Sequence, residues 1–401
     1  MILAHKIALD PTCKQMAALA RAAGCARFAY NWGLNEWKTQ YAAGAKPTAA
    51  SIKKRFNEIK EVQFPWIYDS PKDANQQAFT DLGNAFNNFF KSVNGKRNGR
   101  RVAFPKFHKK GRRDSFYVSN DKFSLSGKSV KLPVIGKVKT REELRLQGKI
   151  LSARVSRTAD KWFISVQVES EARVPNTPKH EIVGVDLGLK TALVTSTGRE
   201  FFAPKPLFAA LKTLKRASRI LARRKKGSSN RRKAAMRVAR IHARVANIRK
   251  DFVSKVTTKL CRENQAVVIE DLNVTGMLRN PRLARAISDV GFGMFGQQVR
   301  YKAEKFGCTL VVADRWFPSS KRCHMCGNVK EKLDLSERTY VCEACGLVED
   351  RDVNAAINLE MYPRLVGNKT PVDTRTKARR QRRVSSVAEA GTNPCAQVRT
   401  I

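Results

Sequence analysis

Two cysteine pairs near the C-terminal end constrain the fold of this chain more than any other feature. Cys323 and Cys326 form one Cys-x-x-Cys unit, Cys342 and Cys345 form a second, and fifteen residues separate the two units. Four thiolates at this spacing can occupy the corners of a tetrahedron around one zinc ion. Because protein ligands then fill every coordination position, such an ion folds a small module and does not activate water. The pattern predicts one structural Zn²⁺ in a zinc ribbon.

The remaining five cysteines have no mutual spacing pattern. Their scatter and odd number favour a reducing compartment, where thiols bind metals or pack in cores and do not form disulfides. They are Cys13, Cys25, Cys261, Cys308 and Cys395. The first ten residues hold too short an apolar stretch for a secretory signal. We therefore expect a cytosolic protein.

The charge of the chain is strongly positive. Its 401 residues include 78 lysines and arginines against 34 acids, a net charge of +44. A chain this basic repels itself unless a polyanion neutralises it, so nucleic acid is the expected partner. An acidic membrane surface is the competing explanation, but no apolar run approaches the ~20 residues of a spanning helix. We expect no membrane role.

The basic residues are concentrated in two segments. Residues 205–250 hold seventeen lysines and arginines, no acid, and apolar residues at helical spacing on both sides of Gly227. A solvated helical face normally mixes in glutamate, so this helical hairpin is expected to contact a polyanion. Residues 95–113 are glycine-rich and basic, with Phe104, Phe107 and His108 interleaved. That mixture suits phosphate binding and base stacking, although a solvated loop is an equal alternative.

Hydrophobic periodicity predicts a multidomain α/β protein. Apolar residues alternate over 116–168, which indicates short antiparallel strands and a small barrel. A helix with an apolar stripe is expected after Pro71, and a proline-containing linker at 173–178 separates a second domain. That domain begins with a three-strand meander over 181–203.

Three acids stand at the ends of predicted elements. Asp186 closes the first meander strand, Glu270 closes a later buried strand, and Asp352 opens the last helix. Each alone could be a cap or a surface charge, but an RNase H-like sheet would gather all three. Such a trio can hold two Mg²⁺ ions about 4 Å apart for phosphodiester hydrolysis.

Four stretches of the chain resemble TnpB, the family of RNA-guided DNA endonucleases that bacterial insertion sequences encode and that is related to type V CRISPR effectors. They occur in the family's order, and weaker similarity runs from residue 1 to about 365. The stretches are Gly184–Leu189, Val268–Val274, Phe317–Gly327 and Asp350–Leu359.

The resemblance implies a particular domain arrangement and a set of functional residues. It assigns the catalytic, Mg²⁺-binding role to Asp186, Glu270 and Asp352 and the zinc ligands to the four paired cysteines; Asp352 is preferred to its neighbour Asp350. The implied domains are a wedge β-barrel (1–10 and 114–172), a helical recognition insert (11–113), a RuvC nuclease domain (181–316 and 350–366) and the zinc ribbon (317–349). The resemblance does not extend over the basic tail (367–401), which lacks periodicity and is expected to be disordered.

The resemblance also implies partners. The family uses a guide RNA from its own transposon end, pairs it with target double-stranded DNA and reads a short motif beside the target, so recognition is split between pairing and protein. The implied motif readers are Lys72, Gln76, Ser119 and Asn120. One protomer per RNA and a place on the bacterial nucleoid are expected.

Two other functions remain open on sequence grounds. RNase H-like sheets with acidic trios also join DNA ends, so a strand-transfer transposase is one alternative. No clear helix-turn-helix domain is visible to bind element termini. A non-catalytic RNA-guided regulator is the other alternative, although the presence of all three acids disfavours it.

Overall fold

The structure, a computed structural model, describes residues 1–97, 99–112, 114–170, 178–334 and 336–367. It divides into two compact units, Met1–Ala172 with Thr213–Ala243 and Arg173–Lys212 with Arg244–Ile401. Apart from Pro178 and Gly367, the predicted linker and the predicted disordered tail lie outside the described residues. In the described part, no helix combines the length and the apolarity needed to cross a bilayer.

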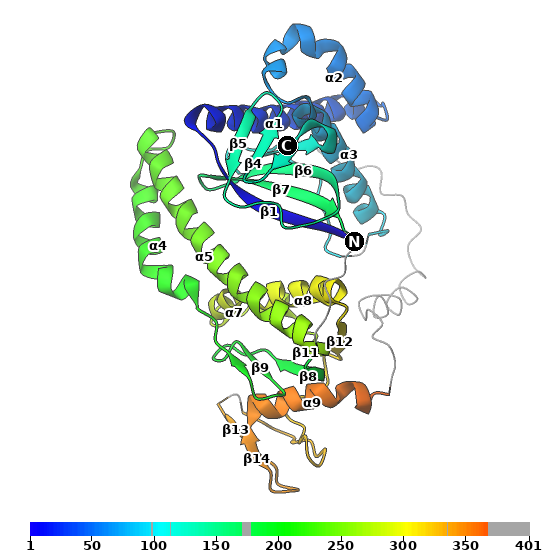
Figure 1. Cartoon of the computed structure of the whole chain (residues 1–401), viewed down its shortest axis with the longest axis vertical. Coiled ribbons are helices and arrows are strands. Elements are labelled where there is room, and N and C mark those ends of the chain that lie inside the picture. The colour runs from blue at the N-terminus through cyan, green and yellow to red at the C-terminus, as the bar shows by residue number, and fades with distance from the viewer. Residues whose placement is uncertain (98, 113, 171–177, 335, 368–401) are drawn as a thin grey trace. The chain divides into compact units, whose positions relative to one another are not determined.

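A seven-stranded sheet is the centre of the first unit (Figure 1). Its hydrogen-bonded order is β2-β6-β7-β1-β5-β4-β3, and every pair is antiparallel. The predicted antiparallel strands are therefore confirmed, while closure into a barrel stays a prediction. The strands are β1 (Ile2–Asp10), β2 (Ser115–Ser119), β3 (Ser124–Ser126), β4 (Ser129–Leu132), β5 (Gly136–Thr140), β6 (Lys149–Thr158) and β7 (Lys161–Glu169).

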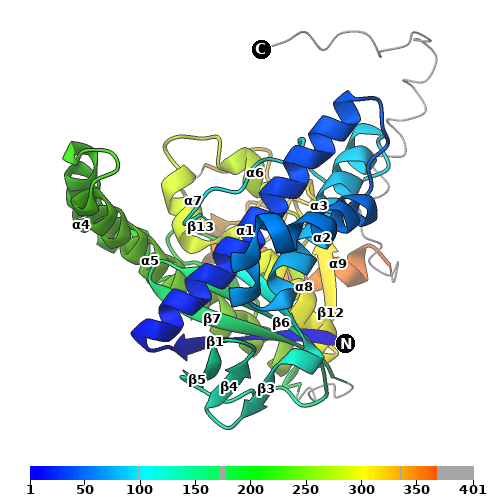
Figure 2. The same ribbon diagram turned by 90° about the horizontal axis from the view of Figure 1, so that it is seen from above.

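Three helices lie between β1 and β2 in the chain, and the length of the first is easiest to follow in Figure 2. They are α1 (Cys13–Ala42), α2 (Ala49–Gln63) and α3 (Lys72–Val93), with 3₁₀ turns η1 (Pro65–Asp69) and η2 (Asn120–Lys122). Thr12 and Gln15 form a capping box that starts α1 where the sequence predicted a helix. The predicted stripe of α3 is buried in a core where the rings of Trp37 and Phe86 stack 4.0 Å apart.

The basic segment after α3 uses its aromatic rings within the first unit. His108 stacks on Tyr30 of α1 with ring centroids 3.8 Å apart, and Phe104 packs edge-on against Phe86 of α3. Both rings therefore hold the segment against the helices, while base stacking by this segment stays a prediction. Sequence alone could not distinguish these uses, because an aromatic in a loop has no periodic neighbours to assign its partner.

The second unit contains a mixed five-stranded sheet with the order β10-β9-β8-β11-β12. Strands β8 (His180–Asp186), β9 (Leu193–Thr195) and β10 (Glu200–Phe201) form an antiparallel meander, which confirms the prediction. β11 (Asn264–Glu270) and β12 (Thr309–Ala313) continue the sheet in parallel with β8. Parallel strands need long crossovers, and helices supply them here.

Helices cover both faces of this sheet. Val183, Val185 and Ile269 pack on one face against α5 (Ser229–Glu263) and α8 (Phe292–Phe306). On the other face, Val268 packs against Leu359 of α9 (Arg351–Leu365). Because successive strand residues point to opposite faces, strands covered on both sides read as continuous apolar runs. The sheet is thus the middle layer of three.

The remaining elements complete the described chain. α4 (Pro206–Arg223) precedes α5, and the two confirm the predicted basic hairpin. Short helices α6 (Val274–Met277) and α7 (Ala284–Val290) precede α8. A two-stranded hairpin of β13 (Thr339–Val341) and β14 (Val348–Asp350) leads into α9.

Candidate active site and zinc site

Strand register places Asp186 and Glu270 side by side. Ile269 of β11 pairs with Val185 of β8, and each acid is the next residue of its strand. Since β8 and β11 are parallel, their carboxyl ends lie at the same edge of the sheet. Alternation puts Asp186 on the face of Gly184 and Glu270 on the face of Val268, the face that α9 covers.

A glycine brings α9 onto that face. A Cβ at Gly184 would lie 1.9 Å from the carbonyl oxygen of Ala356 and 2.5 Å from the backbone nitrogen of Glu360. The backbone of α9 therefore crosses β8 directly, with no side chain between them. Asp352 stands one helical turn before Ala356, and its charge acts on Asp186 at the end of β8.

Asp350 and Asp352 have different roles in the structure. Asp350 is the N-cap of α9, and its Oδ1 accepts hydrogen bonds from the backbone nitrogens of Asp352 (2.8 Å) and Val353 (3.1 Å). Its carboxylate satisfies the orphan donors of the first turn. The side chain of Asp352 takes no part in capping, which is consistent with its selection as the acid of the trio.

The electrostatics of Asp186 reflect the proximity of all three acids. Burial, followed by the negative charges of Glu270 and Asp352, raises the pKa of its carboxyl from 3.8 to about 8. Neighbouring like charges and desolvation both disfavour the ionised form. A buried carboxyl whose pKa is perturbed by two neighbouring acids is typical of a functional site.

The other two carboxylates accept hydrogen bonds or form ion pairs with nearby donors. Asp352 pairs with Arg338 at 3.4 Å and with Arg351 at 3.1 Å, and Glu270 accepts a hydrogen bond from the hydroxyl of Ser319. Among the described residues, only the four cysteines offer three or more ligand atoms that all lie within 4.8 Å of one another. Glu270 and Asp352 lie close enough to Asp186 for their charges to act on it, but the carboxylate oxygens of the three acids do not form such a group.

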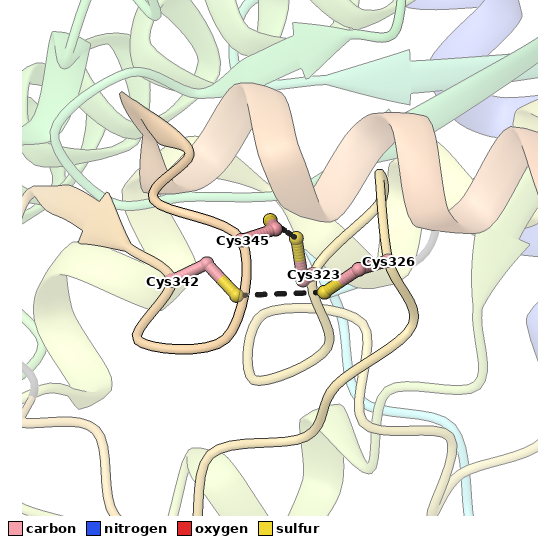
Figure 3. A group of neighbouring side chains, drawn as sticks. All are labelled: Cys323, Cys326, Cys342 and Cys345. Atoms are coloured by element: carbon pink, nitrogen blue, oxygen red, sulfur yellow. Dashed lines mark hydrogen bonds between the residues drawn. The ribbon is translucent and has the colours of Figure 1, made fainter.

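The four cysteines converge as the spacing predicted (Figure 3). The sulfur atoms of Cys323 and Cys345 lie 3.6 Å apart, and those of Cys326 and Cys342 lie 3.5 Å apart. A tetrahedral ion with Zn–S bonds of about 2.3 Å requires sulfurs about 3.8 Å apart. The donor set therefore fits Zn²⁺.

Both cysteine turns have the same backbone design. The nitrogen of Cys323 donates to Asn328 and that of Gly327 to Cys323; the nitrogens of Cys342 and Gly346 repeat this pattern with Leu347 and Cys342. Each glycine adopts a positive φ, +79° and +75°, that residues with a side chain rarely take. Backbone N–H groups, first that of Cys345, lower the pKa of the Cys342 thiol to about 6.

Two buried asparagines connect α9, the helix that carries Asp352, to the zinc module. Asn354 donates to the carbonyl of Arg322 at 2.8 Å and accepts from the backbone nitrogen of His324 at 3.1 Å. Asn358 donates to the carbonyls of Ser319 and Arg322 at 3.0 and 2.6 Å. The sequence analysis did not identify these residues as functional. Their helical i, i+4 spacing within the last motif was the available signal.

A cleft of about 350 Å³ opens beside Glu270. Gly293 and Gly296 of α8 line it, so this part of the helix presents backbone instead of side chains. Gln297 and Arg300 supply polar groups in the same cleft. The arrangement leaves space next to the acids for a ligand with hydrogen-bonding and anionic groups.

The four predicted motif readers lie on two adjoining segments of the first unit. Lys72 and Gln76 are in the first turns of α3, and Ser119 and Asn120 end β2 and begin η2. Asp73, which the sequence analysis did not single out, accepts hydrogen bonds from the nitrogen and hydroxyl of Ser119 at 2.8 and 2.7 Å. The structure brings the two segments together, while their reading role stays a prediction.

Family comparisons match three parts of the chain. A family described as a probable transposase matches residues 164–281, a Cas12f1-like TNB domain matches 292–359, and a helix-turn-helix domain matches 1–46. In the structure, residues 1–46 form the strand β1 and most of the single long helix α1. The second match contains the cysteine cluster and Asp352.

Two curated bacterial relatives match along most of their length. The chain is 36% identical over 370 residues to a protein of Streptomyces pristinaespiralis named as an RNA-guided DNA endonuclease, covering 89% of this chain and 88% of that one. It is 33% identical to InsQ of Escherichia coli K12, which carries the same description, over 89% and 91%. A solved structure of the mini-RNA-guided endonuclease CRISPR-Cas_phi3 matches with a TM-score of 0.45 and 9% identity, covering 90% and 92%.

Proposed function

Because the chain belongs to the TnpB family of RNA-guided DNA endonucleases, we propose that Asp186, Glu270 and Asp352 are the acids with which it cuts DNA. The observation that supports this assignment is their convergence from two strand ends and one helix start, where burial and the charges of Glu270 and Asp352 raise the pKa of Asp186. Three acids gathered at one place supply the oxygen ligands that divalent-cation binding requires.

The three acids would hold two Mg²⁺ ions, which together supply an activated water and charge stabilisation at the leaving 3′ oxygen. Other residues of the chain position the three acids. The close contact at Gly184 fixes Asp352 relative to Asp186, and Ser319 orients the carboxylate of Glu270. Arg338 and Arg351 offset the charge of Asp352 while no cation is bound.

The zinc module has a supporting role in this proposal. Cys323, Cys326, Cys342 and Cys345 would hold one closed-shell Zn²⁺ that folds residues 317–349. Through Asn354 and Asn358, the folded module holds the start of α9 and the segment around Ser319. The zinc site would thereby influence catalysis without touching the substrate.

In this proposal, the first unit and the basic hairpin bind the guide RNA and the target DNA. The seven-stranded sheet would close as the wedge barrel, with α1–α3 as the recognition insert and Lys72, Gln76, Ser119 and Asn120 beside the target-adjacent motif. The second sheet with α9 would be the RuvC domain. A guide RNA from the transposon end would bind one protomer, and base pairing would select the target DNA.

The test is reconstitution of cutting. The protein is purified with RNA transcribed from the end of its own element and offered matched double-stranded DNA with Mg²⁺. We expect cleavage that requires a matched guide and that is lost in Asp186→Ala. If a matched guide with Mg²⁺ yields no cut product, or if Asp186→Ala cuts as well as the wild type, the assignment is wrong. Joined DNA ends in place of cut ends would instead favour strand transfer.

A further inference from the structure

Trp316 is an exposed aromatic side chain, three residues before Ser319, which donates a hydrogen bond to the acid Glu270. It is 85% exposed, whereas Phe317, the next residue, is partly buried against Val268 and Leu359. A tryptophan is large and mostly apolar, so leaving its ring in water forgoes the burial that it would gain in a core. Exposed aromatic rings are the side chains on which proteins that bind single-stranded nucleic acid stack successive bases.

The backbone around Trp316 is fixed from both sides. Its nitrogen donates to Oδ1 of Asp314 at 2.8 Å, and the nitrogen of Asp314 donates to the hydroxyl of Tyr362 at 3.1 Å. Arg315 pairs with Asp271 at 2.5 Å, and Phe317 packs edge-on against Tyr362 with ring centroids 4.9 Å apart. The ring is therefore presented by a rigid turn, which reduces the entropy lost when a ligand binds.

This turn lies next to the proposed catalytic acids. Ala313, three residues before Trp316, pairs with Glu270 in the sheet, and Ser319, three residues after it, donates a hydrogen bond to Glu270. Consecutive Cα atoms are 3.8 Å apart, so the Cα of Trp316 lies within roughly 11 Å of those of both residues. Arg315 moreover contacts Asp271, the residue that follows Glu270.

We infer that Trp316 stacks on an unpaired base of the DNA strand that is being cut. The inference rests on the proposed function and names a further positioning residue for it. Every base offers a π-face, so an exposed ring binds a single strand without sequence preference. The charge of the chain fits the same ligand, because a net charge of +44 favours binding of a polyanion.

A second copy of the chain is a poorer occupant for this ring. Each copy carries a net charge of +44, which two copies would bring together at a mutual surface. A nucleic-acid strand neutralises that charge. The strand must in any case pass the acids to be cut there, so the stacking contact lies on the path that the proposed reaction requires.

The experiment couples a protein change to a DNA change. Single-turnover cleavage by the guide-loaded protein is measured for wild type, Trp316→Ala and Trp316→Phe on DNA carrying an abasic site at each position near the cut in turn. Loss of stacking by Trp316→Ala is expected to lower the apparent second-order rate constant by roughly 5- to 150-fold, which corresponds to ~1–3 kcal/mol. Trp316→Phe should retain most of the rate, because its ring can also stack.

The abasic series distinguishes stacking from a structural role. At one or two positions, the missing base should slow the wild type but leave the rate of Trp316→Ala unchanged. Phe202→Ala, which removes another exposed aromatic of the same unit, should cut like the wild type. Wild-type rates for Trp316→Ala would overturn the inference, as would equal abasic sensitivity in wild type and Trp316→Ala. A change in oligomeric state with unchanged cutting would assign the ring to self-association. If the wild type itself does not cut, the proposed function fails instead.

Discussion

The role of each acid at this site depends on which groups its oxygens contact. Asp350 caps a helix, Asp271 pairs with Arg315, and Asp186 has two other acids as its main charged neighbours. The sequence motifs show five carboxylates close to one another in the chain or at strand ends, but they do not show these contacts. The structure therefore separates acids that stabilise the fold from acids whose arrangement destabilises it.

Asp186→Asn should make the ion-free protein more stable at alkaline pH. The folded-state pKa of Asp186 is raised to about 8 against 3.8 for an ordinary carboxyl. Between these values the folded state binds the extra proton, so its free energy of unfolding falls as pH rises from about 4 to about 8. Asparagine removes this charge and should raise the free energy of unfolding at pH 8 by on the order of 1–2 kcal/mol.

The measurement is thermal unfolding with EDTA at pH 5 and pH 8, together with cleavage in Mg²⁺. The stabilisation should be present at pH 8 and nearly absent at pH 5, and cleavage should be abolished. If Asp186→Asn unfolds at a lower temperature than the wild type at pH 8, the ionised carboxylate of Asp186 does not destabilise the folded state.

Substitutions at Asp350 and Asp352 should separate capping from catalysis. Asp352→Asn is expected to abolish cleavage with little change in unfolding temperature. Asp350→Asn should retain cleavage because asparagine is also a good N-cap, while Asp350→Ala should lower stability by about 1 kcal/mol. Cleavage rates and unfolding midpoints of the three variants check this assignment. Loss of cutting in Asp350→Asn with full cutting in Asp352→Asn would reverse it.

At the scale of elements, hydrophobic periodicity predicted those strands and helices that depend on the local sequence. The strands ending at Asp186 and Glu270 follow from continuous apolar runs, and the helix after Pro71 follows from its apolar stripe. The four zinc ligands follow from spacing alone. The direct crossing of α9 over β8 did not follow, because a glycine in a strand can equally mark a bulge or a turn. The anchoring asparagines were missed because their partners are backbone carbonyls distant in the chain.

Gly184→Ala should disrupt the contact between β8 and α9. The new methyl group would meet backbone atoms of α9 that cannot move without displacing the helix. We expect a loss of roughly 3 kcal/mol or more in the free energy of unfolding, and slower cleavage in the folded fraction because Asp352 is displaced. Gly296→Ala is the control, since a Cβ there meets no atom within 4 Å and alanine favours the helix. Equal stabilities of the two variants in chemical denaturation would contradict the packing argument.

Zinc removal should stop cleavage but leave RNA binding intact. The cysteine cluster holds the segment around Ser319 and the start of α9, whereas the acid-free basic helices lie at residues 205–250. Cys342→Ser should therefore lose the single bound zinc and reduce the cleavage rate by roughly 10- to 100-fold or more, with an RNA affinity within about twofold of wild type. Cys13→Ser, at an exposed cysteine outside the cluster, should retain both activities. Zinc content by atomic spectroscopy, cleavage and RNA affinity are measured together; full cutting by zinc-free protein would sink the argument.

On the scale of the whole molecule, the net charge of +44 is far larger than a simple nuclease with three acids and one zinc site requires. Each phosphate neutralised by a lysine or arginine releases condensed counterions, so RNA affinity should fall steeply with salt. Charge of this kind contributes affinity and association rate, while base pairing contributes specificity. The distribution of the charge then decides which surface holds the RNA.

The acid-free hairpin should carry a disproportionate share of that binding. Replacing Arg223, Arg224 and Lys225 by glutamine removes three exposed charges at its turn, and we expect the slope of log affinity against log salt to become shallower by up to about 2, at roughly 0.7 for each single-strand phosphate that is no longer neutralised. The matched control replaces three exposed lysines of the seven-stranded sheet, Lys128, Lys131 and Lys137, and so removes the same net charge. If both triple variants change the slope equally, overall charge alone holds the RNA; if only the hairpin variant does, the absence of acids from residues 205–250 marks an RNA-binding surface.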